Sequence, residues 1–388
     1  MAKFREVTEV TVIGGGVVGL STAYHLAKEG VDVILVERNE LASGATGSNS
    51  AMCGESSAPE PAGRWHKIFE NLGTELRYNI EYIESPVIFV YTPENIKEMK
   101  KIGIWEDFSS KMVIGEKIKE IEPRLAEDII GVSQTSGHFV NPFKLCYGFA
   151  QATKRLGGKI HLHTNVKEIK VSNGVVRTVV TDKGEIKTDF VVNAAGAWSS
   201  LIGNMVGIDI PVVPLKGHIL VTEPAQKTDP FHLQIINEFM YNIYPYNQRP
   251  EAVNSNDPRI RLGIAAYITY DPVTNNYILG GSHEFNGYDR QVNPDTVRHI
   301  AKHCIRIIPQ LRKINIIRIF TGFRPYCYVD GESIFSKVEG IEGFIIATGT
   351  GGEGLILGPM GGKLISELII RDKTSLPIDA YSFSRFKN

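Results

Sequence analysis

The clearest hydrophobic pattern lies near the N-terminus, where two short apolar runs flank an amphipathic stretch. Residues 10–13 and 33–36 are continuous runs rich in Val, Ile and Leu, as expected of strands buried on both faces of a parallel sheet. Between them, residues 17–30 carry apolar side chains at the three-to-four spacing of a helix. This order predicts a strand–helix–strand unit at the start of the chain.

Later apolar runs predict a return to that first sheet. Residues 190–198 read as a buried strand ending in small residues, and residues 344–349 as another that leads through glycines into a helix ending near residue 370. Between these runs, β-rich segments in residues 212–281 predict a largely antiparallel second sheet. Other expected elements are helices over about 60–83 and 294–308, a charged helical region over 94–122, a helix after Pro142, and strands at 87–91, 159–163, 175–181 and 186–189.

A glycine turn joins the first predicted strand to its helix and indicates a nucleotide site. Gly14 permits a tight turn, Gly16 lets a diphosphate approach the backbone, and Gly19 lets helix and strand pack closely. The helix then points its positive N-terminus at the phosphates. Glu37 follows the second strand, 37 − 19 = 18 residues after the last glycine, close to the spacing of about 20 for a ribose-binding acid. This acid would repel a 2′-phosphate, so NADP is disfavoured.

Two further glycine-rich segments extend this prediction. The small-residue loop 41–50 directly follows the acid and is expected to wrap around a ligand. Gly351, Gly352 and Gly354 lie between the last apolar run and the last helix, and so repeat the strand–turn–helix order near the C-terminus. Both ends of the chain are therefore expected to bind one large ligand. The N-terminus of the last helix would face the reactive end of that ligand.

Composition narrows the class of protein. The chain of 388 residues is 43% hydrophobic and 22% charged, with a formal net charge of −1, which gives no basic footprint for nucleic acid. The four cysteines form no CxxC pair, so no metal or iron–sulfur site is predicted and a reducing compartment fits best. No apolar stretch of about 18 residues is present to span a bilayer. We expect a soluble, cytoplasmic protein of two interleaved domains.

Taken together, the motifs resemble the D-amino-acid oxidase superfamily of FAD-dependent enzymes. The nearest branch is similar to glycine oxidase and to the β subunits of sarcosine oxidase and of D-hydroxyproline or opine dehydrogenases. The resemblance covers nearly the whole chain, in the family's order. It rests on the glycine turn with Glu37 and on residues 44–49, 193–198, 213–217, 280–284, 322–325, 349–354 and 358–359.

The resemblance implies an α/β fold (α+β overall) in which a Rossmann-like FAD-binding domain is interleaved with an antiparallel-sheet substrate domain. The expected FAD-binding domain comprises residues 1–85, 140–210 and 320–388, and the substrate domain comprises residues 86–139 and 211–319. The implied reaction is oxidation of the C–N bond of a small amino acid, such as glycine, sarcosine, proline or hydroxyproline. A hydride would pass to flavin N5 and leave an imine.

By the same resemblance, non-covalently bound FAD would contact residues from every nucleotide-domain motif. Glu37 would bind the adenosine ribose, and Arg38 would lie near the adenine. The full expected set is Gly14, Gly16, Val17, Val18, Gly19, Glu37, Arg38, Ser43, Thr46, Ser48, Asn49, Val166, Ala194, Ala195, Gly196, Trp198, Gly351, Gly352, Glu353, Gly354 and Leu355. Many relatives have His at the position of Glu353, a departure that bears on oxygen reactivity.

On the substrate side, Arg324 is the expected carboxylate ligand, because a guanidinium binds a carboxylate through two parallel hydrogen bonds. Tyr241 and Tyr244 lie where the family places a substrate-side tyrosine, and which of the two faces the site stays open. His283 is a candidate for the rim of the site. Cys327 lies near the position of a covalent flavin link in some sarcosine oxidases, but it does not align with that position and is interpreted as core.

Two alternatives stay open at this point. A 2-hydroxy acid or glycerol phosphate could replace the amino acid, although Lys313, Arg318 and Arg324 are too dispersed for a phosphate site. The chain could also be the flavin-bearing subunit of a complex that passes electrons to a partner. The sequence leaves open the enantiomer, the acceptor (oxygen or a carrier), and any partner subunit or homo-oligomer.

Overall fold

The computed structural model describes residues 4–54, 62–101, 106, 109, 111–225, 235–238 and 256–386. Its first sheet runs in the order β17 (Ile334–Lys337), β18 (Phe344–Thr348), β11 (Gly184–Asn193), β1 (Phe4–Ile13), β2 (Val33–Val36) and β8 (Lys159–His161). β18, β11, β1, β2 and β8 are parallel. Because parallel strands end at the same edge, the residues that follow β1, β2, β11 and β18 come together there.

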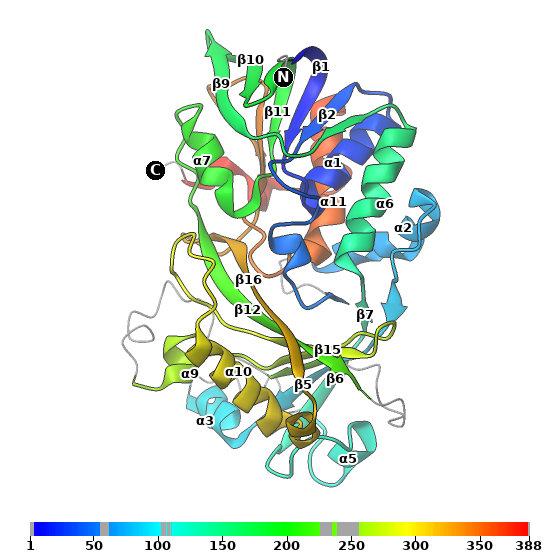
Figure 1. The fold of residues 1–388 in the computed structure, drawn as a ribbon, viewed down its shortest axis with the longest axis vertical. Helices are drawn as coiled ribbons and strands as arrows, with labels where there is room; N and C mark the ends of the chain where they lie inside the picture. The colour runs from blue at the N-terminus through cyan, green and yellow to red at the C-terminus, as the bar shows by residue number, and fades with distance from the viewer. Residues whose placement is uncertain are drawn as a thin grey trace.

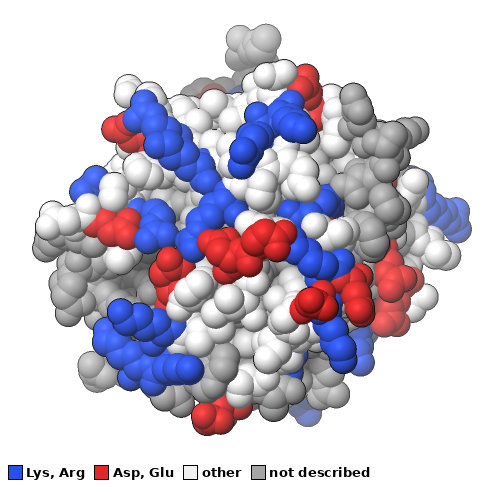
Figure 2. Space-filling model, turned by 90° about the horizontal axis from the view of Figure 1, so that it is seen from below, with Lys and Arg blue, Asp and Glu red and all other residues white. Residues whose placement is uncertain are grey.

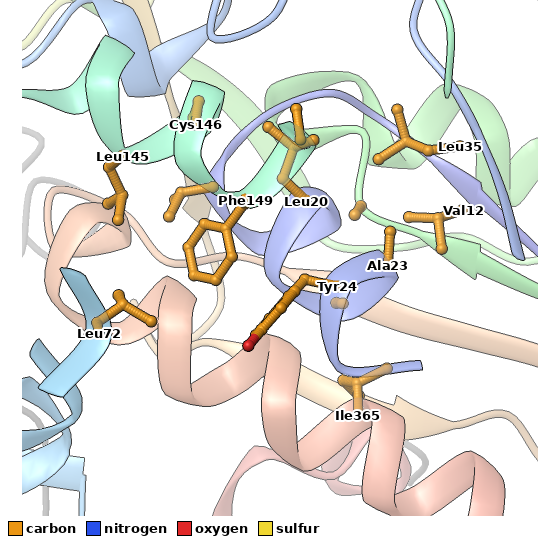
Figure 3. Close-up of a cluster of buried hydrophobic side chains, with 14 of the residues drawn as sticks. Val12, Leu20, Ala23, Tyr24, Leu35, Leu72, Leu145, Cys146, Phe149 and Ile365 are labelled. Carbon is orange, nitrogen blue, oxygen red and sulfur yellow. The ribbon is translucent and has the colours of Figure 1, made fainter. Parts of the chain in front are cut away.

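Helices cover this sheet, and a glycine lets two of them pack closely against each other. α1 (Val17–Lys28) lies beside α11 (Gly354–Arg371) and α6 (Pro142–Arg155) (Figure 1). A Cβ added at Gly362 would stand 2.6 Å from the Cβ of Ser21, so only glycine allows α11 to approach α1 this closely. Figure 3 shows the resulting core, in which Tyr24 of α1 lies beside Phe149 of α6, while Ala23 of α1 points toward Val12 of the first sheet.

The second sheet is largely antiparallel, as predicted. Its order is β16 (Ile316–Cys327), β12 (Val212–Pro224), β15 (Asn276–Gly280), β14 (Tyr267–Tyr270), β13 (Ile235–Glu238), β5 (Val87–Tyr91) and β6 (Gly131–Thr135), with β13 and β5 parallel. α10 (Pro294–Ile307) buries Ile300, Cys304 and Ile307 in the same hydrophobic cluster as Leu220 and Leu279 of this sheet. The long strands β12 and β16 connect the upper and lower parts of the molecule in Figure 1.

The remaining elements are short or peripheral. β3 (Met52–Gly54), β7 (Gly137–Phe139) and β4 (Ile83–Glu84) form a small sheet. β9 (Val166–Ser172) and β10 (Val175–Thr181) extend the first sheet. The other helices are α2 (Phe69–Leu76), α3 (Pro93–Lys101), α5 (Lys117–Ile121), α7 (Ser199–Asn204) and α9 (Pro258–Arg261), with 3-10 turns at Ala45–Gly47, Ala62–Ile68, Gly196–Trp198, Pro309–Lys313, Asp379–Tyr381 and Phe383–Phe386.

The predicted fold class is confirmed, but several elements differ from expectation. The strands expected at 186–189 and 190–198 are one strand, β11, which ends at Asn193 and pairs with β10 on one side and with β1 on the other. The helix expected over about 60–83 is a 3-10 turn followed by α2, which ends where Arg77 adopts a left-handed conformation. β16 was not predicted, and the expected domain boundary between residues 319 and 320 falls inside it. The division into two domains stays a prediction.

Surface charge, helix length and clusters of metal-ligating side chains bear on the partners and ligands that the chain could bind. On the face shown in Figure 2, Lys and Arg side chains are interspersed with Asp and Glu, without a broad patch of one sign. Among the described residues, no helix is long and apolar enough to cross a membrane. The same residues hold no group of three or more His, Cys, Asp or Glu side chains that could bind a metal ion.

Candidate functional site

A cavity of about 1040 Å³ lies at the sheet edge where β1, β2, β11 and β18 end. Its volume is at the upper end of the usual range of roughly 300–1000 Å³ for small-molecule sites, so it suits a large ligand. Its wall combines both sheets: Gly14 and Glu37 come from the first, and Gly217, Ile219 and Arg324 from the second. The cavity therefore joins a nucleotide-type edge to the antiparallel sheet.

The glycine turn owes its shape to two close backbone contacts. Gly14 has φ of +120°, and a Cβ there would stand 2.3 Å from the carbonyl oxygen of Ala194. A Cβ on Gly19 would stand 2.1 Å from the carbonyl oxygen of Gly14. Gly16 also lines the cavity, as Gly14 does, but a Cβ on Gly16 would meet only the Thr46 hydroxyl, at 3.2 Å. Gly14 and Gly19 thus shape the turn, while Gly16 leaves room for a ligand.

Glu37 is held against this turn. Its Oε2 accepts a hydrogen bond from the backbone N–H of Gly15 at 2.7 Å, and its Oε1 accepts one from Asn39 N–H at 2.8 Å. The next residue, Arg38, lies over the ring of Trp198 with its guanidinium carbon 3.8 Å from the ring centroid. Partial burial lowers the pKa of Arg38, against the opposing effect of the Glu37 carboxylate. Both side chains line the cavity, and their contact with the adenosine end of a cofactor stays a prediction.

The small-residue loop packs across the start of α1. The backbone N–H of Val17, in the first turn of α1, donates to the Thr46 hydroxyl at 3.2 Å. Asn49 caps the loop, because its Nδ2 donates to the Thr46 carbonyl and its Oδ1 accepts from Ala51 N–H at 2.6 Å. The N-cap residue of α1, Gly16, has no side chain to accept from the first turn, so an anion bound there would meet the positive end of the helix.

The third strand end, after β11, forms the floor of the same cavity. Asn193 is fully buried, with its Nδ2 donating to the carbonyl of Ser199 at 2.9 Å. Ser199 in turn donates to the hydroxyl of Thr348 at 2.9 Å, and Thr348 donates to the carbonyl of Gly196 at 3.1 Å. This chain of hydrogen bonds couples the end of β11 to the end of β18, where the C-terminal glycine segment begins.

The start of α11 also lines the cavity. Its N-cap residue is Glu353, whose side chain makes no capping hydrogen bond to the first turn of the helix. Glu332 lines the cavity as well, and burial together with the charges of Asp330 and Glu353 raises its pKa. This end of the cavity is therefore acidic.

Arg324 reaches the cavity from β16 across the backbone of β12. A Cβ on Gly217 would stand 2.4 Å from its Nη1, so the guanidinium lies flat against the Gly217 backbone. Nη1 donates to the carbonyl of Ser282 at 2.9 Å. Gly281 is close on the other side, where a Cβ would be 3.6 Å from Nη2. The guanidinium is thus fixed in place by backbone contacts.

His283 lies beside Arg324 and is almost completely buried. Burial and the charge of Arg324 lower its pKa to about 3, so the imidazole is neutral at neutral pH. Its Nδ1 is 2.9 Å from the carbonyl of Gly263, which can only accept, so Nδ1 carries the proton. Tyr267 and Ile219 lie close to the Gly280–Gly281 segment here, and Phe89 and Met52 also line the cavity.

The structure brings most of the predicted residues to one cavity. All predicted cofactor residues except Gly19 line it, together with Arg324 and His283. Gly19 lies behind the turn against Gly14, which corrects its expected contact with the diphosphate. Tyr241 and Tyr244 lie outside the described residues. Cys327 is fully buried and does not line the cavity, as expected of a core residue.

Several wall residues could not be given a role from the sequence. Tyr267 reads only as part of an apolar strand. Gly217 and Gly281 lie in segments that carry the family resemblance, but their contact with Arg324 is visible only in the structure. Arg290 also lines the cavity, with its guanidinium carbon 5.8 Å from the centroid of the Trp198 ring. None of these positions has a local spacing rule that would single it out.

The fold and the cavity define a two-sheet protein of the dinucleotide-binding oxidoreductase class. A family model for FAD-dependent oxidoreductases matches residues 9–368, and the chain belongs to this family. Its cofactor is accordingly FAD, as predicted. The residues present fit that group, because the cavity is large, the α1 N-terminus opens into it, and Gly16 leaves a cradle that a Cβ would begin to fill.

Comparisons with individual proteins agree with the family. The chain is 25% identical to mitochondrial dimethylglycine dehydrogenase of Mus musculus over 388 residues, covering 95% of this chain but 43% of that protein. The chain thus spans less than half the length of this relative. It is 25% identical to glycine oxidase of Geobacillus kaustophilus, with 97% of both chains covered. The solved structure of L-proline dehydrogenase from P. horikoshii is similar at a TM-score of 0.81, with 28% identity and 99% and 98% of the two chains covered.

Proposed function

We propose that this chain oxidises the C–N bond of a small amino acid, which binds through its carboxylate to Arg324. The observation that carries the proposal is the fixed guanidinium of Arg324, which shares one cavity with the nucleotide cradle of Gly14, Gly16 and Glu37. A partly buried guanidinium held against glycine backbone keeps its donors in a set direction, which suits a carboxylate. Similarity to glycine oxidase and L-proline dehydrogenase supports an amino acid of this kind.

FAD would be held non-covalently along the edge of the first sheet. Glu37 and Arg38 would take the adenosine end, the α1 N-terminus with Thr46 the diphosphate, and residues 351–355 the ring end. When bound, FAD accepts the hydride that the amino acid loses. Cys327 is excluded from the cavity wall by its burial in the core, which supports the absence of a covalent link through this residue.

At the substrate end of the cavity, the side chains can orient the substrate but supply no strong base. Arg324 would fix the carboxylate, and the neutral imidazole of His283 would lie beside the guanidinium. Because its pKa lies near 3, His283 is a weak base, so we assign no general base and expect the substrate to react with its amine neutral. Ile219, Phe89 and Met52 give this end an apolar wall that suits a small substrate.

An anaerobic absorbance experiment tests the proposal. The purified protein, reconstituted with FAD, is mixed in turn with glycine, sarcosine, D-proline and L-proline, and the flavin absorbance is followed. We expect bleaching by at least one of the four. A protein that takes up no FAD would contradict the cofactor assignment, and a flavin that none of the four bleaches would contradict the substrate class. Acetate, which has the carboxylate but no amine, is the control that should bind without bleaching.

A further inference from the structure

The carbonyl of Ser282, which holds Arg324, belongs to a closed network of buried polar groups. The hydroxyl of Ser282 lies 2.9 Å from Nδ1 of His218 and accepts a hydrogen bond from the His218 backbone N–H at 3.2 Å. Both residues have a relative exposure of 0%. Neither lines the cavity, so this network stands behind the wall that carries Arg324.

The tautomer of His218 follows from its second contact. The backbone N–H of Asn293 donates to Nε2 of His218 at 3.0 Å, so Nε2 is an acceptor and a neutral ring carries its proton on Nδ1. Oε1 of Glu284 is 3.1 Å from the same Nδ1. The imidazole thus joins the residue before α10 to the segment that follows β15.

Glu284 completes the network from the other side. Its carboxylate accepts a hydrogen bond from the Thr296 hydroxyl at 3.3 Å, and hydrogen bonds from His218 and Ser282 help to lower its pKa against the effect of burial. Its backbone exchanges two hydrogen bonds of 2.9 Å with the backbone of Lys216. Ser282 is therefore held between β12 and the start of α10, with buried partners on both sides.

The alternation of β12 separates the two faces of this arrangement. Gly217 and Ile219 face the cavity, whereas His218 lies between them on the opposite face. His218 therefore influences the cavity only through its contacts with the segment 281–284, which contains Ser282. That segment carries two residues of the wall, Gly281 and His283, as well as the Ser282 carbonyl that holds Arg324, so one anchor sets all three.

We propose that His218, acting with Ser282 and Glu284, is a positioning residue that fixes the Arg324 guanidinium for the substrate carboxylate. This rests on the proposed function of Arg324. The network supplies no group to the reaction and touches no substrate. Its effect is on where the guanidinium lies, and a displacement of about 1 Å is enough to cost on the order of 100-fold in a positioned site.

The test compares a carboxylate substrate with its carboxamide. For whichever amino acid bleaches the flavin, kcat/KM is measured for the acid and for the corresponding amide, and the ratio reports carboxylate recognition. His218→Leu removes both ring nitrogens, and Ser282→Ala removes the hydroxyl but keeps the carbonyl. In both variants we expect the ratio to fall by about tenfold or more, mainly through KM. The dissociation constant of acetate, measured by calorimetry, should rise in parallel.

Two controls separate positioning from general damage. His218→Asn places an amide N–H near the position of Nδ1 and should recover most of the ratio. His303→Leu removes another buried histidine of the same sheet–helix layer and should lower neither the ratio nor acetate affinity. If His218→Leu lowers kcat/KM equally for acid and amide, the positioning role is wrong. If His218→Leu does not fold, the same comparison of kcat/KM for acid and amide is made with Ser282→Ala.

The outcome also separates this inference from the function on which it rests. Arg324→Ala should abolish the preference for the acid. If it does not, the proposed carboxylate site itself is wrong. If Arg324→Ala lowers the ratio while Ser282→Ala and His218→Leu leave it unchanged, the carboxylate site stands and the positioning role of His218 is overturned.

Discussion

Glu37 and Gly15 are joined by a hydrogen bond of 2.7 Å from the Gly15 backbone N–H to the Glu37 carboxylate. The acid after β2 therefore ties down the turn after β1. A second bond from Asn39 N–H holds the other carboxylate oxygen. Glu37 thus preorganises the glycine turn and also lines the cavity at its adenosine end.

Replacing Glu37 should weaken FAD binding through both roles. For Glu37→Ala we expect the FAD dissociation constant of the apoprotein to rise by about 10- to 100-fold, because a hydrogen bond to a charged group contributes roughly 1.5–3 kcal/mol. Glu37→Gln keeps one acceptor oxygen and should lose less. Fluorescence titration with FAD measures both. Glu40→Gln removes an exposed carboxylate three residues away and is the control. Wild-type affinity in Glu37→Ala would disprove both roles.

Substitutions at two glycines of the same turn should have different effects, one on stability and one on FAD binding. A methyl at Gly19 would collide with the backbone carbonyl of Gly14, so Gly19→Ala should lower the unfolding free energy of the apoprotein by about 1–3 kcal/mol or more. A methyl at Gly16 would meet only the movable Thr46 hydroxyl and project into the cavity, so Gly16→Ala should fold normally but retain little FAD. Thermal unfolding of the apoproteins and flavin content after purification separate the two. A Gly16→Ala protein with full flavin content would contradict the cradle assignment.

The nucleotide end of the site could be predicted because its signals are local. The turn, α1, β2 and Glu37 lie within residues 10–37, where spacing and residue type determine backbone geometry. The substrate end depends on contacts across the second sheet. Gly217 and Arg324 are more than 100 residues apart, and only the pairing of β12 with β16 places one against the other.

β16 was missed for a physical reason. Gly322 and Pro325 interrupt its apolar pattern and resemble a loop, yet the strand lies at the edge of the second sheet, where proline is tolerated. Gly322 is needed there, because a Cβ would stand 2.4 Å from the Cβ of Ser48 in the small-residue loop. Gly322, which looks like a strand breaker in the sequence, is thus the residue that lets β16 pack against the small-residue loop at the cavity.

The buried histidine of α1 should make the fold sensitive to acid. Burial lowers the pKa of His25 from 6.5 to about 4. Because the unfolded chain takes up the proton near pH 6.5 and the folded chain only near pH 4, the stability due to the neutral ring is fully present above pH 6.5. It is lost as the pH falls from about 6.5 to about 4, by on the order of 3 kcal/mol for a difference of 6.5 − 4 = 2.5 pH units.

Thermal unfolding between pH 7 and pH 4 checks this expectation. The melting temperature of the wild-type protein should fall more steeply with acid than that of His25→Gln, which cannot titrate. Other groups also contribute to acid unfolding, so the informative quantity is the difference between the two curves. His163→Gln, at an exposed position, should follow the wild-type curve. Parallel curves for wild type and His25→Gln would show that this ring is not the source of the sensitivity.

The sharpest prediction concerns Arg324 itself. Arg324→Ala should raise KM strongly and reduce kcat/KM by the equivalent of about 2–5 kcal/mol, since it removes one partner of a buried charge pair with the substrate. Arg324→Lys keeps the charge but lacks the planar fork, so it should recover only part of the loss. FAD affinity should stay close to wild type, because the cradle of Gly16, Thr46 and Glu37 is untouched. Arg318→Ala, on the exposed part of the same strand, should leave the kinetics unchanged. If Arg324→Ala retains the wild-type KM, the carboxylate is bound elsewhere in the cavity, and the orientation of the whole substrate must be reassigned.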